Sequence, residues 1–361
     1  MKISIVGTVG LPANYGGFET LVENLVAHHD KHGPPVSITV YCSGKSYSVR
    51  QASYLSAKLR YIPLHANGAQ SVLYDVMSII WSVKNRSDII LLLGVSGAIA
   101  LPFVRLFSSA RVITNVDGIE WRRDKWKGLA KRFLKLSEQL AMRWSHSVIA
   151  DNEAIAQYVR STYNVSTEVI AYGGDHALSV AESDISEYSL PENFAFGVCR
   201  IEPENNLHLI LEAFAQNPSA NLVMVGNWDK SVYGKELRER YRGTPNMYLL
   251  DPIYDVGALR ALRTQAEVYV HGHSAGGTNP SLVEAMQFGL PVLAFDCSFN
   301  RETTEGKAIY FRDAADLSSQ LRSADRNHWS EVGKHMLEIS GRRYKWSTVA
   351  EQYFHLFLKD A

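Results

Sequence analysis

The sequence predicts an α/β protein with two lobes, and three observations lead to this prediction. Short apolar runs with strand character alternate with longer segments of helical period, which is typical of parallel sheets covered by helices. The chain has 361 residues, and one domain usually takes roughly 150. The alternation is interrupted once, between Gly173 and Phe194, by a polar stretch that we interpret as the interdomain boundary.

In the first half of the chain, strands are expected at residues 3–6, 36–41, 59–62, 88–93, 112–115, 147–150 and 168–170. The segment after Gly16-Gly17 predicts a helix that packs an apolar face on the sheet while Glu19 and Glu23 face elsewhere. That apolar face consists of Phe18, Leu21, Val22 and Leu25. Residues 89–104 are apolar but too few, and too rich in glycine, for a membrane span, so they predict a buried strand followed by a helix.

The second half repeats the alternation. Strands are expected at residues 194–198, 221–225, 247–250, 268–271 and 291–295, and helices at residues 207–214, 256–262 and 281–288. Residues 346–358 predict a last amphipathic helix that buries aromatic side chains. Two α/β lobes imply a cleft between them, which is a common place for a ligand site.

Composition excludes several classes of protein. Apolar residues make up 46% of the chain and charged residues 20%, so the chain can bury a large core and disorder is excluded as its main state. Basic and acidic residues number 37 each, so no net charge favours a nucleic-acid partner. The three cysteines lie far apart and the N-terminus runs straight into a strand-like segment. We therefore expect a reducing cytoplasm, no zinc site and no export signal.

Two glycine-rich loops are candidates for binding an anion. The first connects the first strand to the first helix, from Gly7 to Gly17, and glycines there let the backbone approach a ligand. Its spacing is neither G-x-G-x-x-G nor a P-loop, so a dinucleotide oxidoreductase and a P-loop enzyme are disfavoured, and a structural turn stays an equal alternative. The second runs from His271 to Pro280 and aims N–H groups at an anion from the start of a helix.

Four charged or titratable residues accompany the second loop. Glu284, about one turn inside the helix, is placed to accept hydrogen bonds from the sugar hydroxyls of a nucleotide, although a solvated helix residue is the alternative. Arg200 ends a strand, where its planar guanidinium suits phosphate oxygens or, alternatively, a surface ion pair. His271 and His273 contact either the ligand or the core. Arg200 and the glycine loop in one lobe predict a diphosphate site.

These motifs carry a family resemblance. Gly16-Gly17-x-Glu19, Arg200 with Pro203-Glu204-Asn205, and the run from Gly276 to Met286 resemble glycosyltransferase family four, whose members retain anomeric configuration. The runs that resemble its bacterial rhamnosyltransferase-like subgroup are Gly10 to Thr20, Asp117 to Trp121 and His273 to Pro280.

The resemblance implies the GT-B fold, with two Rossmann-like lobes facing each other across a cleft. Residues 1–175 would bind the acceptor, residues 176–340 the nucleotide sugar, and residues 341–361 would cross back to the first lobe. The family needs no metal and no cofactor beyond the nucleotide-sugar substrate, and the sequence contains no Asp-x-Asp. The reaction would take place in the cleft.

The resemblance also suggests site residues. The candidates for the reacting centre are Gly16, Gly17, Asp117 and Arg200. Donor binding is expected from Arg200, Asn205, His273, Gly276, Gly277, Thr278, Asn279, Ser281 and Glu284. Acceptor binding is expected from Tyr15, Phe18, Glu19 and Glu120.

Three positions depart from the family pattern. Gly276 stands where the first of two glutamates is usual, and Asn205 replaces a lysine, so Arg200 would carry more of the phosphate charge. Asp117 replaces a histidine that reaches the 6-hydroxyl of the sugar. Losing it is compatible with a 6-deoxy sugar, so L-rhamnose from dTDP-L-rhamnose is the preferred donor and a UDP-hexose the alternative. Asp117 either assists removal of the acceptor proton or caps a helix.

The segment from Trp121 to Lys135 has seven basic residues and one acidic residue, with aromatic side chains between them. Such a segment suits an anionic membrane surface, and a solvated helix is the equal alternative. We expect a polyprenyl-diphosphate-linked glycan acceptor in polysaccharide or O-antigen assembly, at the inner face of the cytoplasmic membrane. Two other functions stay open: a sugar-nucleotide 2-epimerase of the same fold, and a binding or scaffold protein without catalysis.

Overall fold

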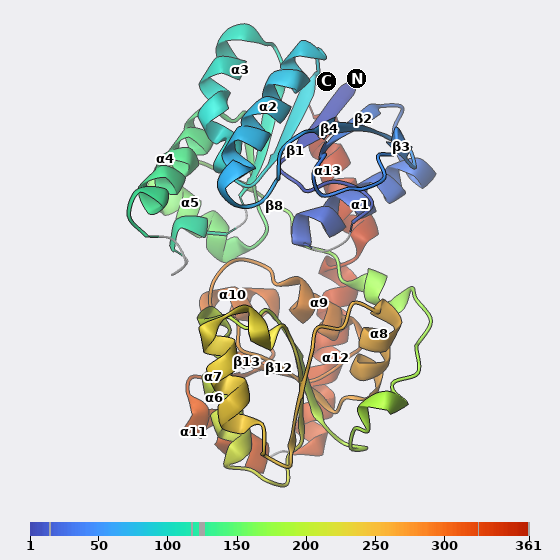
Figure 1. Cartoon of the computed structure of the whole chain (residues 1–361), viewed down its shortest axis with the longest axis vertical. Helices are drawn as coiled ribbons and strands as arrows, with labels where there is room; N and C mark the ends of the chain where they lie inside the picture. The colour runs from blue at the N-terminus through green and yellow to red at the C-terminus, as the bar shows by residue number, and fades with distance from the viewer. Residues whose placement is uncertain (14–15, 117, 123–126, 324, 360–361) are drawn as a thin grey trace. The chain divides into compact units, whose positions relative to one another are not determined.

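The computed structural model describes residues 1–361 except 14–15, 117, 123–126, 324 and 360–361 (Figure 1). The chain forms two compact units, one made of Met1–Ala171 with Trp346–Ala361 and the other of Tyr172–Lys345. The division lies a few residues from the expected boundaries at 175 and 340. Helix α12, Arg326–Arg343, runs on past residue 340 without interruption, which carries the second unit to Lys345.

The first unit is built on an eight-stranded sheet in the order β3-β4-β2-β1-β5-β6-β7-β8. All neighbours are parallel except β3 and β4. The strands are β1 Lys2–Val6, β2 Ser37–Ser43, β3 Ser53–Tyr54, β4 Ala57–Ile62, β5 Ile89–Leu93, β6 Arg111–Val116, β7 Ser147–Ala150 and β8 Glu168–Val169. Every strand expected in this half is present, and the two-residue β3 is additional.

Six α-helices accompany this sheet in the described part of the unit: α1 Gly17–His32, α2 Ser71–Lys84, α3 Leu101–Phe107, α4 Gly128–Trp144, α5 Glu153–Tyr163 and α13 Trp346–Leu358. As the resemblance implies, the C-terminal helix α13 belongs to the first unit, where it packs beside α1 (Figure 1). The ring of Phe354 stacks on His28 and His29 at centroid distances of 6.1 and 5.6 Å. Arg111 adds hydrogen bonds to the carbonyls of Leu356 and Lys359.

The second unit is built on a six-stranded parallel sheet in the order β11-β10-β9-β12-β13-β14. The strands are β9 Ala195–Val198, β10 Leu222–Val225, β11 Met247–Leu250, β12 Val268–His271, β13 Val292–Phe295 and β14 Ile309–Phe311. Besides α12, its α-helices are α6 Leu207–Ala215, α7 Val232–Tyr241, α8 Val256–Gln265, α9 Pro280–Gln287, α10 Ser298–Thr303 and α11 Ala314–Arg322. The expected strands and helices are present, and β14, α7, α10, α11 and α12 are additional.

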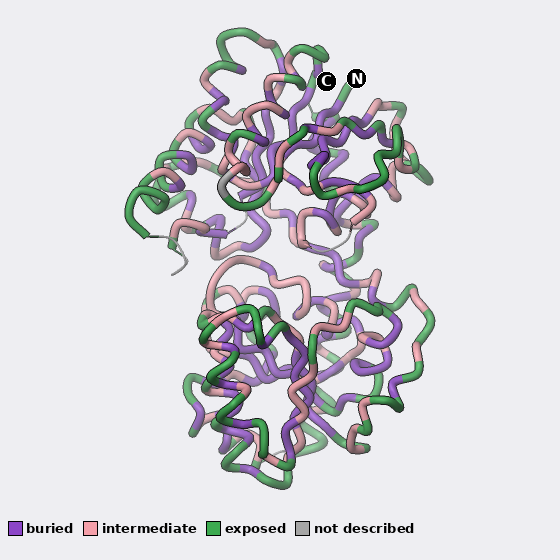
Figure 2. The backbone as a smooth tube through the Cα atoms, in the orientation of Figure 1, coloured by how far each residue is buried: buried purple, intermediate pink, exposed green. Residues whose placement is uncertain are grey.

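Short 3-10 helices lie in the connections: η1 Gly68–Gln70, η2 Ser96–Ala100, η3 Glu120–Arg122, η4 Asp175–Leu178, η5 Ser186–Tyr188, η6 Pro203–Asn205 and η7 Trp228–Lys230. The central strands of both sheets, such as β5 and β10, are fully buried (Figure 2). This burial explains why their sequences read as apolar runs, since a parallel sheet has helices on both faces.

The strand order places both glycine-rich loops at comparable positions. In the first sheet β1 lies between β2 and β5, and in the second sheet β9 and β12 are neighbours from which the order runs in opposite directions. In open α/β sheets, ligands bind outside the carboxyl ends of the strands at such switch points. The loop after β1 and the loops after β9 and β12 therefore occupy the expected place for ligand binding within their own units.

Candidate active site

The loops after β9 and β12 are joined by buried hydrogen bonds. The Asn205 amide nitrogen Nδ2 donates to the carbonyl of Arg200 at 2.7 Å, which leaves Oδ1 facing Nδ1 of His273, also at 2.7 Å. Because the amide oxygen can only accept, His273 donates from Nδ1. Asn205 and His273 are 4% and 8% exposed. Asn205, which stands where the family has lysine, thus holds two loops together.

A close backbone approach between the same loops requires glycine at position 272. A Cβ atom added to Gly272 would lie 2.1 Å from the carbonyl oxygen of Asn205. Asn206 donates from Nδ2 to the carbonyl of Gly272 at 2.9 Å, and Ser274 donates from its N–H to the carbonyl of Glu204 at 2.9 Å. The loop after β12 therefore packs directly against the η6 turn.

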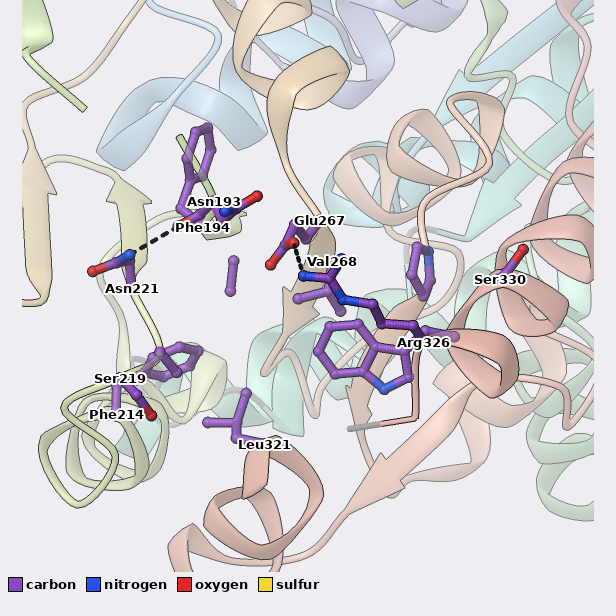
Figure 3. Close-up of a pocket in the computed structure, with 14 residues that line it drawn as sticks. Asn193, Phe194, Phe214, Ser219, Asn221, Glu267, Val268, Leu321, Arg326 and Ser330 are labelled. Atoms are coloured by element: carbon purple, nitrogen blue, oxygen red, sulfur yellow. Dashed lines mark hydrogen bonds and ion pairs between the residues drawn. The ribbon is translucent and has the colours of Figure 1, made fainter. Parts of the chain in front are cut away.

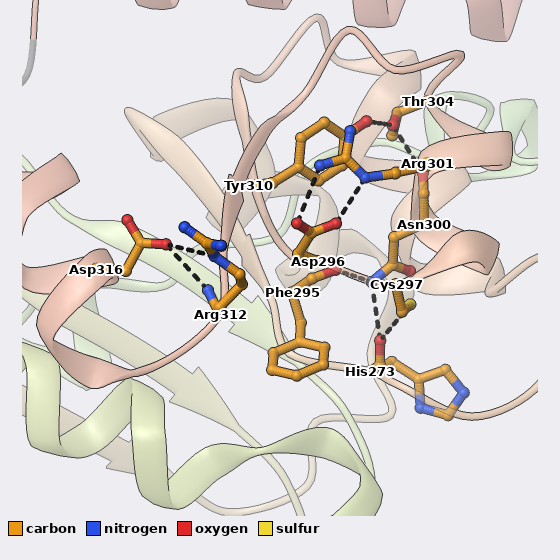
Figure 4. A network of polar contacts seen from close by, with 10 residues as sticks. All are labelled: His273, Phe295, Asp296, Cys297, Asn300, Arg301, Thr304, Tyr310, Arg312 and Asp316. Carbon is orange, nitrogen blue, oxygen red and sulfur yellow. Dashed lines mark hydrogen bonds and ion pairs between the residues drawn. The ribbon is translucent and has the colours of Figure 1, made fainter.

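Helix α10, which follows the neighbouring strand β13, also holds this loop (Figure 4). The amide of Asn300 donates to the carbonyl of His273 at 2.8 Å. Arg301 forms two hydrogen bonds with Asp296, at 2.6 and 3.0 Å, and its guanidinium carbon lies 4.2 Å from the ring centre of Tyr310. The backbone carbonyl of His273 is thus held by α10, and its ring is held by Asn205.

Helix α9 begins at the end of the glycine loop. Gly276 has φ +105°, a conformation that L side chains rarely adopt. Asn279 caps the helix, because its Oδ1 accepts from the N–H and the hydroxyl of Ser281 at 3.1 and 2.9 Å. Pro280 occupies the first turn, as the sequence predicts. The first N–H groups of α9 and the positive end of its dipole therefore lie beside Gly277 and the buried Thr278.

Glu284 is not a solvated helix residue. Its carboxylate accepts a hydrogen bond from Arg263 of α8, and its Oε1 lies 3.3 Å from Nε2 of His176 in η4. Burial raises the pKa of Glu284, but Arg263 and His176 outweigh this effect and hold the pKa below its ordinary value. Glu284 is therefore ionised at neutral pH.

Arg263 and His176 are site residues that the sequence analysis did not identify. Arg263 is 3% exposed, yet its position in a helix with charged neighbours gives no signal of burial. His176 lies in the polar stretch that we interpret as a boundary. A Cβ atom on Gly174 would lie 2.6 Å from the carbonyl of Val283, so this stretch passes directly against α9.

Arg200 is exposed, whereas His271 is buried. The guanidinium of Arg200 is exposed, and none of the ion pairs found among the described residues involves it. His271 is a core residue, 3% exposed, and burial together with His273 lowers its pKa to about 3. His271 is therefore neutral, and only His273 of the pair lies in the loop itself.

In the first unit, Glu19 is buried on its helix, whereas the sequence predicts that it faces away from the packed side. It is 7% exposed, and its Oε1 accepts from the hydroxyl of Thr8 at 2.9 Å and the N–H of Val9 at 2.6 Å. The carboxylate joins the loop after β1 to α1. Gly16 has φ +134°, and a Cβ atom there would lie 1.9 Å from Glu19 Oε2.

For the other first-unit candidates, the structure gives fewer contacts. Phe18 is half-buried beside the β5 loop, since its Cε2 would lie 3.6 Å from a Cβ atom on Gly94. Glu120 is half-buried in η3. Tyr15 and Asp117 lie outside the described residues. The structure thus brings together the second-unit candidates around the ends of β9 and β12, and the candidates Gly16, Gly17, Phe18 and Glu19 at the start of α1.

A pocket of about 560 Å³ lies elsewhere in the second unit (Figure 3). Phe194, Asn221 and Val268, which line it, stand at the amino ends of β9, β10 and β12. Arg326 and Glu267 form an ion pair beside it at 3.6 Å. The pocket is therefore on the opposite edge of the sheet from the glycine loop, and it is not the expected donor site.

Neither a metal-binding cluster nor a membrane-spanning helix is found in the described part of the chain. Across residues 1–361 with the stated gaps, no group of three or more His, Cys, Asp or Glu side chains is arranged to hold a metal ion. No helix in the described part of the chain is both long enough and apolar enough to cross a bilayer.

Solved structures share the fold over the whole chain. The sucrose-phosphate synthase of Thermosynechococcus elongatus aligns with a TM-score of 0.82 and 18% identity over 99% of this chain and 98% of its own. Anabaena HepE in complex with UDP aligns with a TM-score of 0.73 and 18% identity over 99% and 100%. The catalytic domain of starch synthase IV from Arabidopsis thaliana, bound to ADP and acarbose, aligns with a TM-score of 0.70 and 14% identity over 99% of this chain and 98% of its own. The fold is that of the GT-B glycosyltransferases.

Two family models match the chain, one in each half. Residues 182–324 match the model described as glycosyl transferases group 1, and residues 1–175 match one described as a domain of unknown function (DUF1972). The second unit therefore contains a glycosyltransferase group 1 domain. No curated protein matches the sequence.

Proposed function

We propose that the protein is a retaining, metal-independent glycosyltransferase of family four that transfers L-rhamnose from dTDP-L-rhamnose to a polyprenyl-diphosphate-linked glycan. Polysaccharide or O-antigen biosynthesis is the proposed pathway, and the inner face of the cytoplasmic membrane is the proposed location. One observation carries the proposal: the group 1 match covers residues 182–324, and Arg200, the glycine loop and Glu284 meet at one sheet edge within that match.

The donor diphosphate is assigned to Arg200 and the start of α9. The exposed guanidinium of Arg200 offers paired donors to phosphate oxygens. The loop from Gly277 to Ser281 and the dipole of α9 favour the negative charge that grows on the departing nucleoside diphosphate. The backbone of both loops is held by Asn205 and Asn279, which bond to the Arg200 carbonyl and to the Ser281 N–H.

Glu284 is assigned to the ribose of the donor. Its pKa lies below the ordinary value, so it is a hydrogen-bond acceptor at neutral pH. Arg263 and His176 orient the carboxylate, and the remaining lone pairs of its oxygens suit the two ribose hydroxyls. We assign no covalent nucleophile: the bond from the anomeric carbon to the diphosphate breaks, the acceptor oxygen bonds to that carbon on the same face, and the acceptor proton passes to the departing diphosphate. Gly16, Gly17 and Asp117 are assigned to that reacting centre.

The choice of rhamnose rests on one replacement in the sequence. Asp117 stands where the family that the chain resembles places a histidine that reaches the 6-hydroxyl of the sugar, and a 6-deoxy sugar lacks that hydroxyl. A second candidate is transfer of a hexose from a UDP-sugar. Anabaena HepE, which shares the fold at 16% identity in its complex with UDP-glucose, favours that alternative.

The test follows label from a panel of radiolabelled nucleotide sugars. Protein and native membranes are incubated separately and together, and label is measured in the lipid extract and in free products. We expect label from dTDP-rhamnose in lipid only when both are present. Arg200→Ala should lower transfer by about tenfold or more, because a charge-assisted hydrogen bond contributes about 1.5–3 kcal/mol. Arg312→Ala, which changes an exposed arginine of the same unit, should leave transfer unchanged.

Other outcomes would select other functions. Faster transfer from a UDP-hexose keeps the enzyme class and rejects rhamnose. Turnover of the donor without membranes indicates the epimerase. Nucleotide binding with no turnover of any donor rejects catalysis and indicates a scaffold.

A further inference from the structure

Exposed apolar side chains are concentrated on one part of the first unit. Sixteen large apolar residues are exposed in the described part of the chain, and six of them lie between residues 99 and 136, about a tenth of its length. They are Ile99, Phe103, Leu106, Phe107, Leu129 and Leu136. Single exposed apolar residues are normal on soluble proteins, but a cluster marks an interaction surface.

These residues come from two helices that pack together and from the η2 turn before them. Helix α3 contacts α4 (Figure 1), and the rings of Phe103 and Phe107 lie 4.7 Å apart. Along α4, Leu129, Arg132 and Leu136 recur with helical spacing on the side opposite the buried Leu134. We call the exposed side of η2, α3 and α4 the α3–α4 face.

A group of cations borders the α3–α4 face at Trp121. The ammonium groups of Lys131 and Lys135 lie 5.7 and 5.1 Å from the Trp121 ring centre, and the guanidinium of Arg122 lies at 5.3 Å. Within the described ranges, aromatic rings and not carboxylates are the partners of these three cations. Three positive charges around one ring repel one another and favour a bound anion.

The acidic residue of α4, Glu138, is buried and is bonded to other groups. Glu138 is 2% exposed, and its Oε1 accepts hydrogen bonds from Trp121 Nε1 at 3.2 Å, Tyr158 at 2.7 Å and Tyr163 at 2.5 Å. These bonds anchor Trp121 and leave the basic side chains of α4 directed to solvent. The face thus combines exposed leucine and phenylalanine with lysine and arginine.

We propose that the α3–α4 face docks on an anionic phospholipid bilayer, with Arg122, Lys131 and Lys135 on the lipid phosphates and the exposed apolar side chains in the headgroup region. Charge complementarity selects this partner, because cations beside apolar and indole side chains fit the boundary between phosphate and acyl chain. The long stems of Lys and Arg cover apolar surface while their charges reach the phosphates. The biological setting rests on the proposed function, in which docking brings the enzyme to a lipid-linked acceptor.

The test uses the full chain and vesicles, without donor or acceptor, so that it does not depend on glycosyl transfer. Sedimentation compares vesicles of phosphatidylcholine with vesicles that also contain phosphatidylglycerol. Binding should require the anionic lipid and weaken with salt. Lys131→Gln with Lys135→Gln, and separately Leu129→Asn with Leu136→Asn, should each weaken binding by about tenfold or more.

The matched control is Lys334→Gln with Leu337→Asn, which removes an exposed lysine and an exposed leucine from α12 in the other unit. This variant should bind like the unchanged protein. Equal sedimentation with both vesicle types, no sedimentation, or equal losses in control and test variants would overturn the proposal. So would release of bound protein by inorganic diphosphate but not by sodium chloride of equal ionic strength, which would identify a small-anion site. Circular dichroism checks that each variant is folded.

Discussion

The Asn205 side chain lies between the carbonyl of Arg200 and the imidazole of His273, with both hydrogen bonds at 2.7 Å. One amide therefore helps to hold the loops after β9 and β12 together, and these loops carry the phosphate-binding candidates. Asn205→Ala should destabilise the second unit by about 1–3 kcal/mol, because two buried polar groups lose their partner. Urea unfolding measures this change, and a cycle with His273→Ala should show a coupling energy between the two residues. Additive effects of the two substitutions would contradict the role of the pair.

Gly272→Ala tests the contact between the same two loops. The new methyl group would lie 2.1 Å from the carbonyl oxygen of Asn205, so the loops must separate. We expect a lower melting temperature and weaker nucleotide-sugar binding by calorimetry. Gly243→Ala is the control, because a Cβ atom there meets nothing within 4 Å. Equal melting temperatures and equal nucleotide-sugar binding in the two variants would show that the two loops tolerate a methyl group at position 272.

Glu284→Gln tests the buried ion pair with Arg263. Removing one partner leaves the other charge buried, which costs about 3–5 kcal/mol. The folded-state pKa of Glu284 is lowered, so its stabilising effect is complete above the unfolded-state value and is lost as pH falls through the folded-state value. The difference in unfolding free energy between the two proteins should therefore be constant from neutral to mildly acidic pH and then narrow. A difference that widened in acid would contradict this assignment.

Asp75 of α2 should give the opposite pH dependence. It is 3% exposed, Ser96 donates a hydrogen bond to it, and burial raises its pKa to about 7. The folded form keeps a proton that the unfolded form releases near pH 4, so this residue lowers stability as pH rises through that window. Asp75→Asn should consequently gain stability relative to the unchanged protein between mildly acidic pH and pH 8. Ser96→Ala keeps the carboxyl group but removes the hydrogen bond that lowers its pKa, so this variant should keep the pH dependence and shift it to higher pH.

Much of the fold was predictable because both sheets are parallel and buried. Strand β7 and helix α13 have the bounds that the sequence predicts, since apolar runs and an amphipathic period leave little choice there. Helix α7 gave a weaker signal, because its sequence is largely polar and contains Gly234. The three-residue strand β14 is too short to show a period.

The candidate site was predictable in its loops but not in its contacts. Glycine, proline and a capping asparagine determine the turn into α9 through local conformation, which a sequence displays. The partners of Glu284 come from positions 263 and 176, and only tertiary packing brings them together. Glu19 was interpreted as outward-facing because charge usually avoids burial, but the N–H of Val9 and the hydroxyl of Thr8 satisfy it inside.

The placement of α13 also affects how the protein is made. The first unit is discontinuous, since residues 172–345 are synthesised before the helix that completes it. A nascent chain that ends before Trp346 would leave α1 without the contacts of Phe354 to His28 and His29. Helix α13 thus leaves the ribosome after residues 172–345 and completes the unit that they interrupt, so the order of translation delays this unit until the second unit has been synthesised.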